Sequence, residues 1–368
     1  MIVPDLSTAQ PGSTPVSEPA GERPSGSTGG AVTVREHQEA RKAVALVLAL
    51  TAGLSLILAL FVSIAVNAGP NGIRLAVAGP PAAVEQIKTG VAQAGGPDAF
   101  EVSVVGDEAA ARAALLDRSI DGAIVIGPNG PTLLTASAGS PAISQLLTVA
   151  AAQLGNPAAT GPPVVDVVPL PSGDSRGVGL AAGSFPMIIA GLALGIAAAL
   201  ALRSRWLVLG TVITGALTIA VSFAGILAWL GVSGGHFWGE FSAISLTIAA
   251  SALVVAGLVR LMGAAGAGLG ALLLVIVGNP LSGIATSPRL LPAPWGEFGQ
   301  WLPTGAGGTL VRTAAYFPEA SVWAPLLVLL GWAVLGAAGV ILGKVRVGGG
   351  HGAADSAVTA EHPVAVAV

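Results

Sequence analysis

Hydrophobic residues are grouped along this chain into long stretches that contain no Asp, Glu, Lys or Arg. The first stretch, from Ala43 to Val66, exceeds the roughly 20 residues that a helix needs to cross the hydrocarbon layer of a membrane. Five further stretches follow in the second half of the chain. We therefore predict six transmembrane helices, at residues 43–66, 179–202, 206–230, 241–259, 261–278 and 322–343.

A cleaved signal peptide is the alternative interpretation of the first stretch. Residues 66–68, Val-Asn-Ala, loosely resemble a cleavage site. The apolar run is longer than the hydrophobic region of a signal peptide and begins late in the chain. A retained membrane anchor is therefore the favoured interpretation.

Between residues 69 and 177 the pattern changes to that of a small soluble domain. Ile73, Leu75 and Val77 alternate with less apolar residues, which predicts a strand, and the next segment has apolar residues at helical spacing. The same reasoning predicts strands at 73–77, 100–104, 123–126, 132–137 and 164–168, and helices at 81–94, 107–120 and 140–154. The order βαβαββαβ indicates a compact α/β domain between the first and second membrane helices.

The segment 279–321 differs from both regions. It follows Gly278, is rich in Pro, Gly and Trp, and keeps a few charged residues, so it resembles neither a plain span nor an ordinary loop. We predict a re-entrant or interfacial pair of helices, about 294–302 and 308–317. The residues proposed to form a gate or lid here are Asn279, Pro280, Glu297, Trp301, Pro303 and Arg312. The hypothesis is that Glu297 and Arg312 form a pair or face a cavity, and the alternative is that both point to water.

Basic residues next to the spans predict the orientation, since cytoplasmic loops carry an excess of Lys and Arg. The residues concerned are Arg41, Lys42, Arg203, Arg205, Arg260, Lys344 and Arg346. All fall on the cytoplasmic side of a plasma membrane if both termini are inside. The α/β domain and segment 279–321 are then outside. The two spans on either side of Arg260 are short and are separated by almost nothing.

The two ends of the chain have the composition of disordered segments. Residues 1–42 are rich in Pro, Ser, Gly and Thr, and residues 344–368 form a second polar tail. Such segments bury too little apolar surface to offset the entropy of ordering. Both are predicted to be disordered cytoplasmic tails.

Composition excludes several classes of function. The chain of 368 residues is 53% hydrophobic and 10% charged, with a net charge of −3 and no Cys. This balance favours a lipid bilayer as partner and disfavours nucleic acid. None of the three Lys residues stands in a phosphate-binding loop, the four His are far apart, and no nucleophile motif is present. We therefore expect no catalytic residue, cofactor or metal site, and no enzyme activity.

Two smaller features concern helix packing and capping. Glycines recur at four-residue spacing within the predicted spans, which allows close helix approach, although chance produces several such pairs in a Gly-rich chain. The pairs are Gly179 and Gly183, Gly191 and Gly195, Gly266 and Gly270, and Gly339 and Gly343. Asp174 and Arg176 are expected to cap or anchor the second span.

This arrangement resembles the ABC-2 type transporter permeases, in the branch of the YhgE/Pip (phage infection protein) group. The resemblance rests on Asp107–Ile126, on Gly177–Gly191 and on Gly278–Tyr316, which contains NPLSG and LPTGAGGTLVRTAAY. It implies export of a hydrophobic or amphipathic compound by a homodimer or hetero-oligomer with a separate ATPase subunit. The chain departs from the pattern at 203–205, where a three-residue connection leaves little room for the helix that contacts an ATPase.

Two other classes of function stay open. A non-transporting envelope scaffold, secretion accessory or surface receptor would use the α/β domain for contacts. An enzyme acting on lipid is disfavoured, because no pair of nucleophile and base can be named.

Overall fold

The computed structural model of the chain describes residues 28–96, 98–128, 130–154 and 162–343. The chain divides into two units, Met1–Leu58 and Ala59–Val368, which are considered separately. Helix α1 (Thr28–Val66) contains the described part of the first unit and the beginning of the second.

The expectation of disorder up to residue 42 is wrong for residues 28–42, which are helical in α1. The segment from Arg35 to Lys42 consists largely of good helix formers. Extending a helix that already exists avoids the cost of nucleation. The remainder of the predicted N-terminal tail and all of 344–368 lie outside the described residues.

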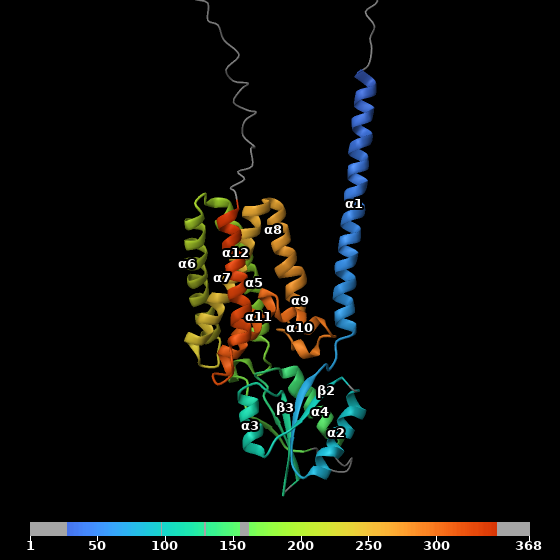
Figure 1. Cartoon of the computed structure of the whole chain (residues 1–368), viewed down its shortest axis with the longest axis vertical. Coiled ribbons are helices and arrows are strands. Elements are labelled where there is room, and N and C mark those ends of the chain that lie inside the picture. Colours follow the sequence, from blue (N-terminus) through green and yellow to red (C-terminus); the bar gives the residue numbers. More distant parts are fainter. Residues whose placement is uncertain (1–27, 97, 129, 155–161, 344–368) are drawn as a thin grey trace, which may run out of the picture. The chain divides into compact units, whose positions relative to one another are not determined.

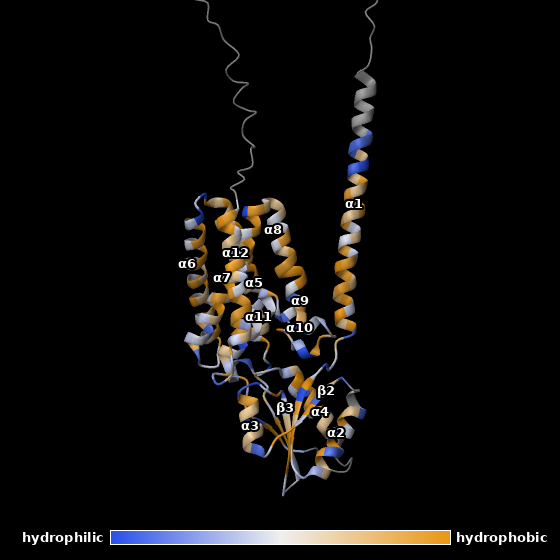
Figure 2. Cartoon of the chain, in the orientation of Figure 1, coloured by the Kyte–Doolittle hydropathy of each residue, from blue (hydrophilic) through white to orange (hydrophobic). Residues whose placement is uncertain are grey.

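Six helices in the described ranges are long and apolar enough to cross a membrane. They are His37–Val66, Gly179–Ala201, Arg205–Trp229, Phe237–Met262, Ala264–Leu281 and Trp323–Leu342. The prediction of a polytopic helical membrane protein is confirmed at this level. In Figure 2 the helices of the second half of the chain are mostly hydrophobic, whereas those of the α/β domain carry more hydrophilic positions.

The helices after the α/β domain form a bundle around α7 (Phe237–Met262), whose side chains are mostly buried. Its other members are α5 (Gly179–Ala201), α6 (Arg205–Trp229), α8 (Ala264–Ala271), the π-helical segment η2 (Leu272–Gly278), α9 (Asn279–Leu281), α11 (Pro303–Tyr316) and α12 (Trp323–Leu342). Helices α5, α6, α11 and α12 all pack against α7. Most of the surface of α7 therefore contacts other parts of the protein, and α7 is the centre of the bundle.

The boundary between the fourth and fifth spans differs from the predicted one. Helix α7 extends through Arg260 to Met262, and the chain reverses at Gly263, whose φ of 68° lies in the left-handed region. Glycine adopts this conformation without a steric penalty. The fifth span therefore begins at Ala264 rather than at 261.

The α/β domain has the element order expected from the sequence. Its elements are β1 (Ile73–Ala78), α2 (Pro81–Gly95), β2 (Phe100–Val104), α3 (Glu108–Leu116), β3 (Gly122–Gly127), β4 (Gly130–Thr135), α4 (Pro141–Leu154) and β5 (Val164–Asp166). The sheet order is β2-β1-β3-β4-β5, and β4 runs antiparallel to β3 while the other neighbours are parallel. One face of the sheet buries Leu75, Leu133 and Leu147 in a core of its own.

The opposite face of the sheet is continuous with the bundle. Ala76, Leu115 and Leu134 belong to the same buried cluster as Ala315 and Phe317 at the end of α11. Figure 1 shows the domain at the end of the bundle where α10 and α11 lie. The domain is thus packed onto the bundle rather than joined to it by a linker alone.

Segment 279–321 contains α9, the 3₁₀ turn η3 (Pro288–Leu290), α10 (Trp295–Gln300) and α11. Helix α11 begins at Pro303, five residues before the predicted start, because proline at the first helical position lacks only an N–H that has no helical partner. Most α11 side chains are buried. Of the two alternatives, a re-entrant or an interfacial helix, the burial of α11 inside the bundle fits the re-entrant one.

Candidate functional site

A cavity of about 680 Å³ lies between the α/β domain and segment 279–321. On the domain side it is lined by residues at the beginnings of β1, β2 and β3 and at the end of antiparallel β4. Ligands of open α/β sheets usually bind at the opposite edge, at the carboxyl ends of parallel strands. Here the amino-terminal edge forms the cavity because it faces the bundle.

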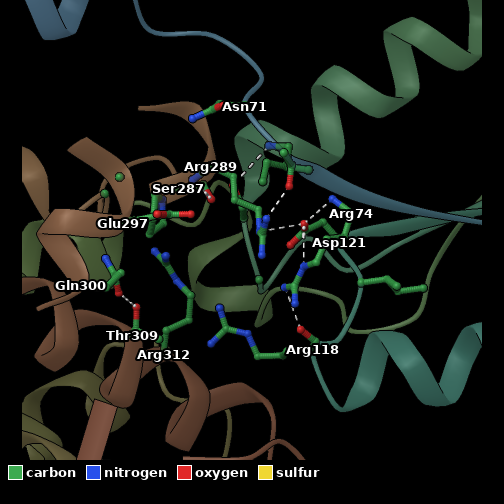
Figure 3. Close-up of a pocket in the computed structure, with 18 of the residues that line it drawn as sticks. Asn71, Arg74, Arg118, Asp121, Ser287, Arg289, Glu297, Gln300, Thr309 and Arg312 are labelled. Atoms are coloured by element: carbon green, nitrogen blue, oxygen red, sulfur yellow. Dashed lines mark hydrogen bonds and ion pairs between the residues drawn. The ribbon is translucent and has the colours of Figure 1, made fainter. Parts of the chain in front are cut away.

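Asp121 holds two arginines at one side of the cavity (Figure 3). Its Oδ2 lies 3.1 Å from Nε of Arg289 and 3.5 Å from Nε of Arg74, and it accepts a 2.9 Å hydrogen bond from the backbone N–H of Arg74. Arg289 also donates to the carbonyl of Gly72. Burial lowers the pKa of Arg289, and Asp121 opposes this effect. The three residues connect the start of β1 to η3.

Two other arginines line the cavity without a carboxylate partner among the described residues. Arg118 donates to Thr313 Oγ1 and lies with its guanidinium carbon 5.0 Å from the ring centre of Phe317. Arg312, only 6% exposed, donates a 2.6 Å hydrogen bond from Nη2 to the carbonyl of Ile284. Burial, followed by the charge of Arg312, lowers the pKa of Arg118 to about 10. The positive charges of Arg118 and Arg312 are thus concentrated on one side of the cavity.

Arg118 has an unusual backbone conformation. Its φ is 61°, in the left-handed region, which costs a residue with a side chain about 1–2 kcal/mol. The N–H of Ser119 donates to the carbonyl of Ala114, as in a helix end that normally carries glycine at the left-handed position. Helix α3 therefore ends at Leu116, and the prediction that it continues to 120 is wrong.

The structure brings together two of the six predicted gate residues. Glu297 and Arg312 both line the cavity, but no ion pair joins them in the described ranges. The other four, Asn279, Pro280, Trp301 and Pro303, do not line it. The Trp301 side chain is 70% exposed, and its carbonyl accepts a 2.8 Å hydrogen bond from Nε1 of Trp332 in α12.

The basic residues predicted to set the topology are not part of the cavity. Arg260 is buried and donates to the carbonyls of Leu202, at 3.3 Å, and Arg203, at 3.1 Å, where α5 ends. A cation at this position complements the negative end of the helix dipole. Arg205 begins α6, and Arg41 and Lys42 lie in α1. Lys344 and Arg346 lie outside the described residues.

A smaller cavity of about 10 Å³ lies next to the large one inside the bundle. The two share Ser282, Ile284 and Gly308 as lining residues. Hydroxyl groups from α5, α7, the turn after α9 and α11 surround the smaller cavity: Ser184, Thr247, Ser251, Ser282 and Thr304. Its volume corresponds to about one water molecule. We call this group of five residues the hydroxyl cluster.

Two buried carboxylates have local structural partners. Asp174 accepts hydrogen bonds from the N–H groups of Val178, at 3.0 Å, and Gly179, at 2.8 Å, so it caps α5 as expected. Glu240 is 1% exposed, and its Oε1 accepts 2.7 and 3.2 Å hydrogen bonds from Ser233 and Gly234. Its Oε2 has no partner within the described part of the chain.

Comparison with known proteins gives no match, whether to a protein-family model, to a curated protein or to a solved structure. Within the described ranges, no group of three or more His, Asp or Glu side chains is arranged to hold a metal ion.

Proposed function

We propose that the chain is the membrane subunit of a transporter resembling the ABC-2 type permeases, and that it exports a hydrophobic or amphipathic compound with a separate ATPase. The observation that carries this proposal is the 680 Å³ cavity at the end of the bundle, within the size range of sites for small organic ligands. The cavity adjoins the hydroxyl cluster, which lies inside the bundle.

The position of the basic residues supports the proposed orientation. Arg203, Arg205 and Arg260 gather where α5 ends and α6 begins, whereas the α/β domain packs against the other end of α5, near Asp174. With these arginines in the cytoplasm, the domain and the cavity lie on the extracytoplasmic side of the plasma membrane. A compound that leaves the bundle would then pass through the cavity.

The pathway is closed in this conformation. The hydroxyl cluster encloses about 10 Å³, far less than an organic compound needs. Transport therefore requires α5, α7 and α11 to separate around the cluster. In the proposed cycle, ATP hydrolysis by the partner subunit supplies the free energy for this separation.

Reconstitution tests the proposal. The full chain is placed in liposomes with each candidate ATPase, and ATP hydrolysis and efflux of fluorescent amphipathic compounds are measured. We expect one ATPase to be stimulated, and Thr304→Val to reduce efflux severalfold because an unpartnered hydroxyl is lost from the cluster. Thr214→Val is the matched control, since Thr214 is exposed on α6 and bonds within its own helix.

Two outcomes would count against a permease. The first is that no ATPase binds or is stimulated. The second is that a partner protein binds the α/β domain while no compound is moved under any condition, which favours a scaffold, secretion accessory or receptor.

A further inference from the structure

The four arginines of the cavity come from separate parts of the chain. Arg74 lies in β1, Arg118 follows α3, Arg289 lies in η3 and Arg312 lies in α11. Asp121 forms ion pairs with only the first and third of these arginines. Three further carboxylates, Asp98, Glu101 and Glu297, line the cavity, but within the described residues none of them forms an ion pair with Arg118 or Arg312.

Both guanidinium groups keep hydrogen-bonding capacity. Each has five N–H donors, and the hydrogen bonds described for Arg118 and Arg312 use one donor of each. Figure 3 shows the two side chains reaching into the same space from the α/β domain and from the bundle. Guanidinium groups in this arrangement match carboxylate and phosphate oxygens.

The rest of the cavity is suited to an apolar group. Phe100, Leu115, Ile120, Ile143 and Ile284 line it beside the polar residues. Leu115 and Ile120 are buried, and Leu115 belongs to the cluster shared by the domain and the bundle. A ligand with an anionic end at the two arginines and an apolar body against these side chains fits this part of the cavity.

The left-handed conformation of Arg118 is a second, independent observation. Glycine would fit that position without a steric penalty, and no backbone contact requires a long side chain there. Strained conformations are concentrated at ligand-binding sites. An arginine retained at a position that favours glycine is consistent with a binding role for its side chain.

We propose that Arg118 and Arg312 bind the phosphate or carboxylate group of an amphipathic compound whose apolar body lies against the apolar side chains of the cavity. The inference rests on the proposed function, because this compound would be the exported substrate. The same chemistry is found in the headgroup of a lipid and in a free acidic compound.

Binding to the full chain in nanodiscs of neutral lipid tests the inference without an ATPase or transport. Octyl phosphate is the probe. Octanol, which lacks the charge, and inorganic phosphate, which lacks the apolar body, are the comparison compounds. We expect octyl phosphate to bind more tightly than either. In Arg118→Gly its affinity should fall by roughly tenfold or more, since hydrogen bonds to a charged group are lost. This variant relieves the backbone conformation but loses the contacts of Arg118 with Thr313 and Phe317, so thermal unfolding is measured to show that the variant is folded.

Arg112→Gln is the matched control, because Arg112 lies on the exposed side of α3 and pairs with Glu108. The affinity of Arg112→Gln for octyl phosphate should equal that of the wild type. Replacing part of the neutral lipid by phosphatidate identifies the source of the ligand. If phosphatidate competes with octyl phosphate, a bilayer lipid occupies the site. If phosphatidate does not compete, the ligand is a free compound.

Equal binding of octanol and octyl phosphate, or wild-type affinity in a folded Arg118→Gly, would overturn the inference. Equal binding of inorganic phosphate and octyl phosphate would overturn its apolar part. If octyl phosphate binds as expected but no ATPase moves any compound, the proposed function fails and the binding site stands. If amphipathic compounds are exported equally by the wild type and Arg118→Gly, the transport proposal stands and this inference fails.

Discussion

Single residues at the cavity show how charge can be buried with partial compensation. Asp121 contacts two arginines, whereas Arg118 and Arg312 rely on a hydroxyl group, a carbonyl group and an aromatic ring. A guanidinium without an opposite charge is costly to remove from water. The residues that compensate it are therefore as important to the site as the arginines.

The absence of an ion pair between Glu297 and Arg312 in the described structure leads to a quantitative prediction. Glu297→Gln, Arg312→Gln and the double variant should give additive changes in the free energy of unfolding, with a coupling below about 0.5 kcal/mol. The physical reason is that Arg312 binds the Ile284 carbonyl instead. Chemical unfolding of the purified protein measures the three changes.

A double-mutant cycle on Asp121 and Arg289 is the positive control, since their atoms lie 3.1 Å apart. Its coupling should fall in the range of about 0.5–3 kcal/mol that is typical of interacting pairs. A coupling above about 1 kcal/mol between Glu297 and Arg312 would show that they interact and would restore the paired gate.

At the residue scale, the sequence identified individual capping residues better than it identified the cavity. Asp174 caps α5, as expected from the sequence, and Asp107, the first residue of a predicted helix, accepts a 2.8 Å hydrogen bond from the N–H of Ala110. Arg118 and Asp121 were missed as site residues, because their role depends on the bundle packed against them. The only local signal was the end of an apolar helical pattern after Leu116, where an arginine occupies the position usual for glycine.

At the scale of elements, close helix packing depends on glycines at specific contacts. A β-carbon on Gly336 of α12 would lie 2.4 Å from backbone atoms of Leu253 and Val254 in α7. Gly339 approaches Gly257 of α7 in the same interface. The glycine pairs found in the sequence at four-residue spacing include Gly339 but not Gly336. Spacing alone does not show which face of a helix contacts a neighbouring helix.

Replacement of Gly336 by alanine should therefore destabilise the bundle. The added carbon meets backbone rather than a flexible side chain, and overpacking of this kind costs about 1–3 kcal/mol. Gly331→Ala in the same helix is the control, because nothing lies within 4 Å of its added carbon. Thermal unfolding should show a lower midpoint for the first variant only, and equal midpoints would contradict the close approach of α7 and α12.

The limits of α11 could not be predicted for a related reason. Its glycines at 305, 307 and 308 lower helix propensity, and the helix was predicted to begin only at 308. In the structure they lie against Gly299, Thr247 and Ile284, where side chains would collide. Tertiary packing thus stabilises a helix that local propensity disfavours.

At the scale of the whole molecule, hydropathy predicted the membrane class because spans are determined by length and composition. The α/β domain was also predictable, since period-two and helical patterns alternate clearly between residues 69 and 177. The packing of this domain onto the bundle was not, because the contacts join residues more than a hundred positions apart, such as Ser140 and Thr286. The cavity exists only through that packing.

The orientation of the molecule in the membrane is the last prediction, and the chain offers a clean test because it contains no Cys. Single cysteines replace Glu108, exposed on α3, and Arg205, exposed at the start of α6. A membrane-impermeant maleimide should label Glu108→Cys in intact cells and Arg205→Cys only after permeabilisation, as the positive-inside rule requires. Ala252→Cys, at a position that is 0% exposed, is the control for inaccessibility and should stay unlabelled in both conditions. The reverse labelling pattern would place the cavity in the cytoplasm. The cavity would then load a compound before transport instead of releasing it afterwards.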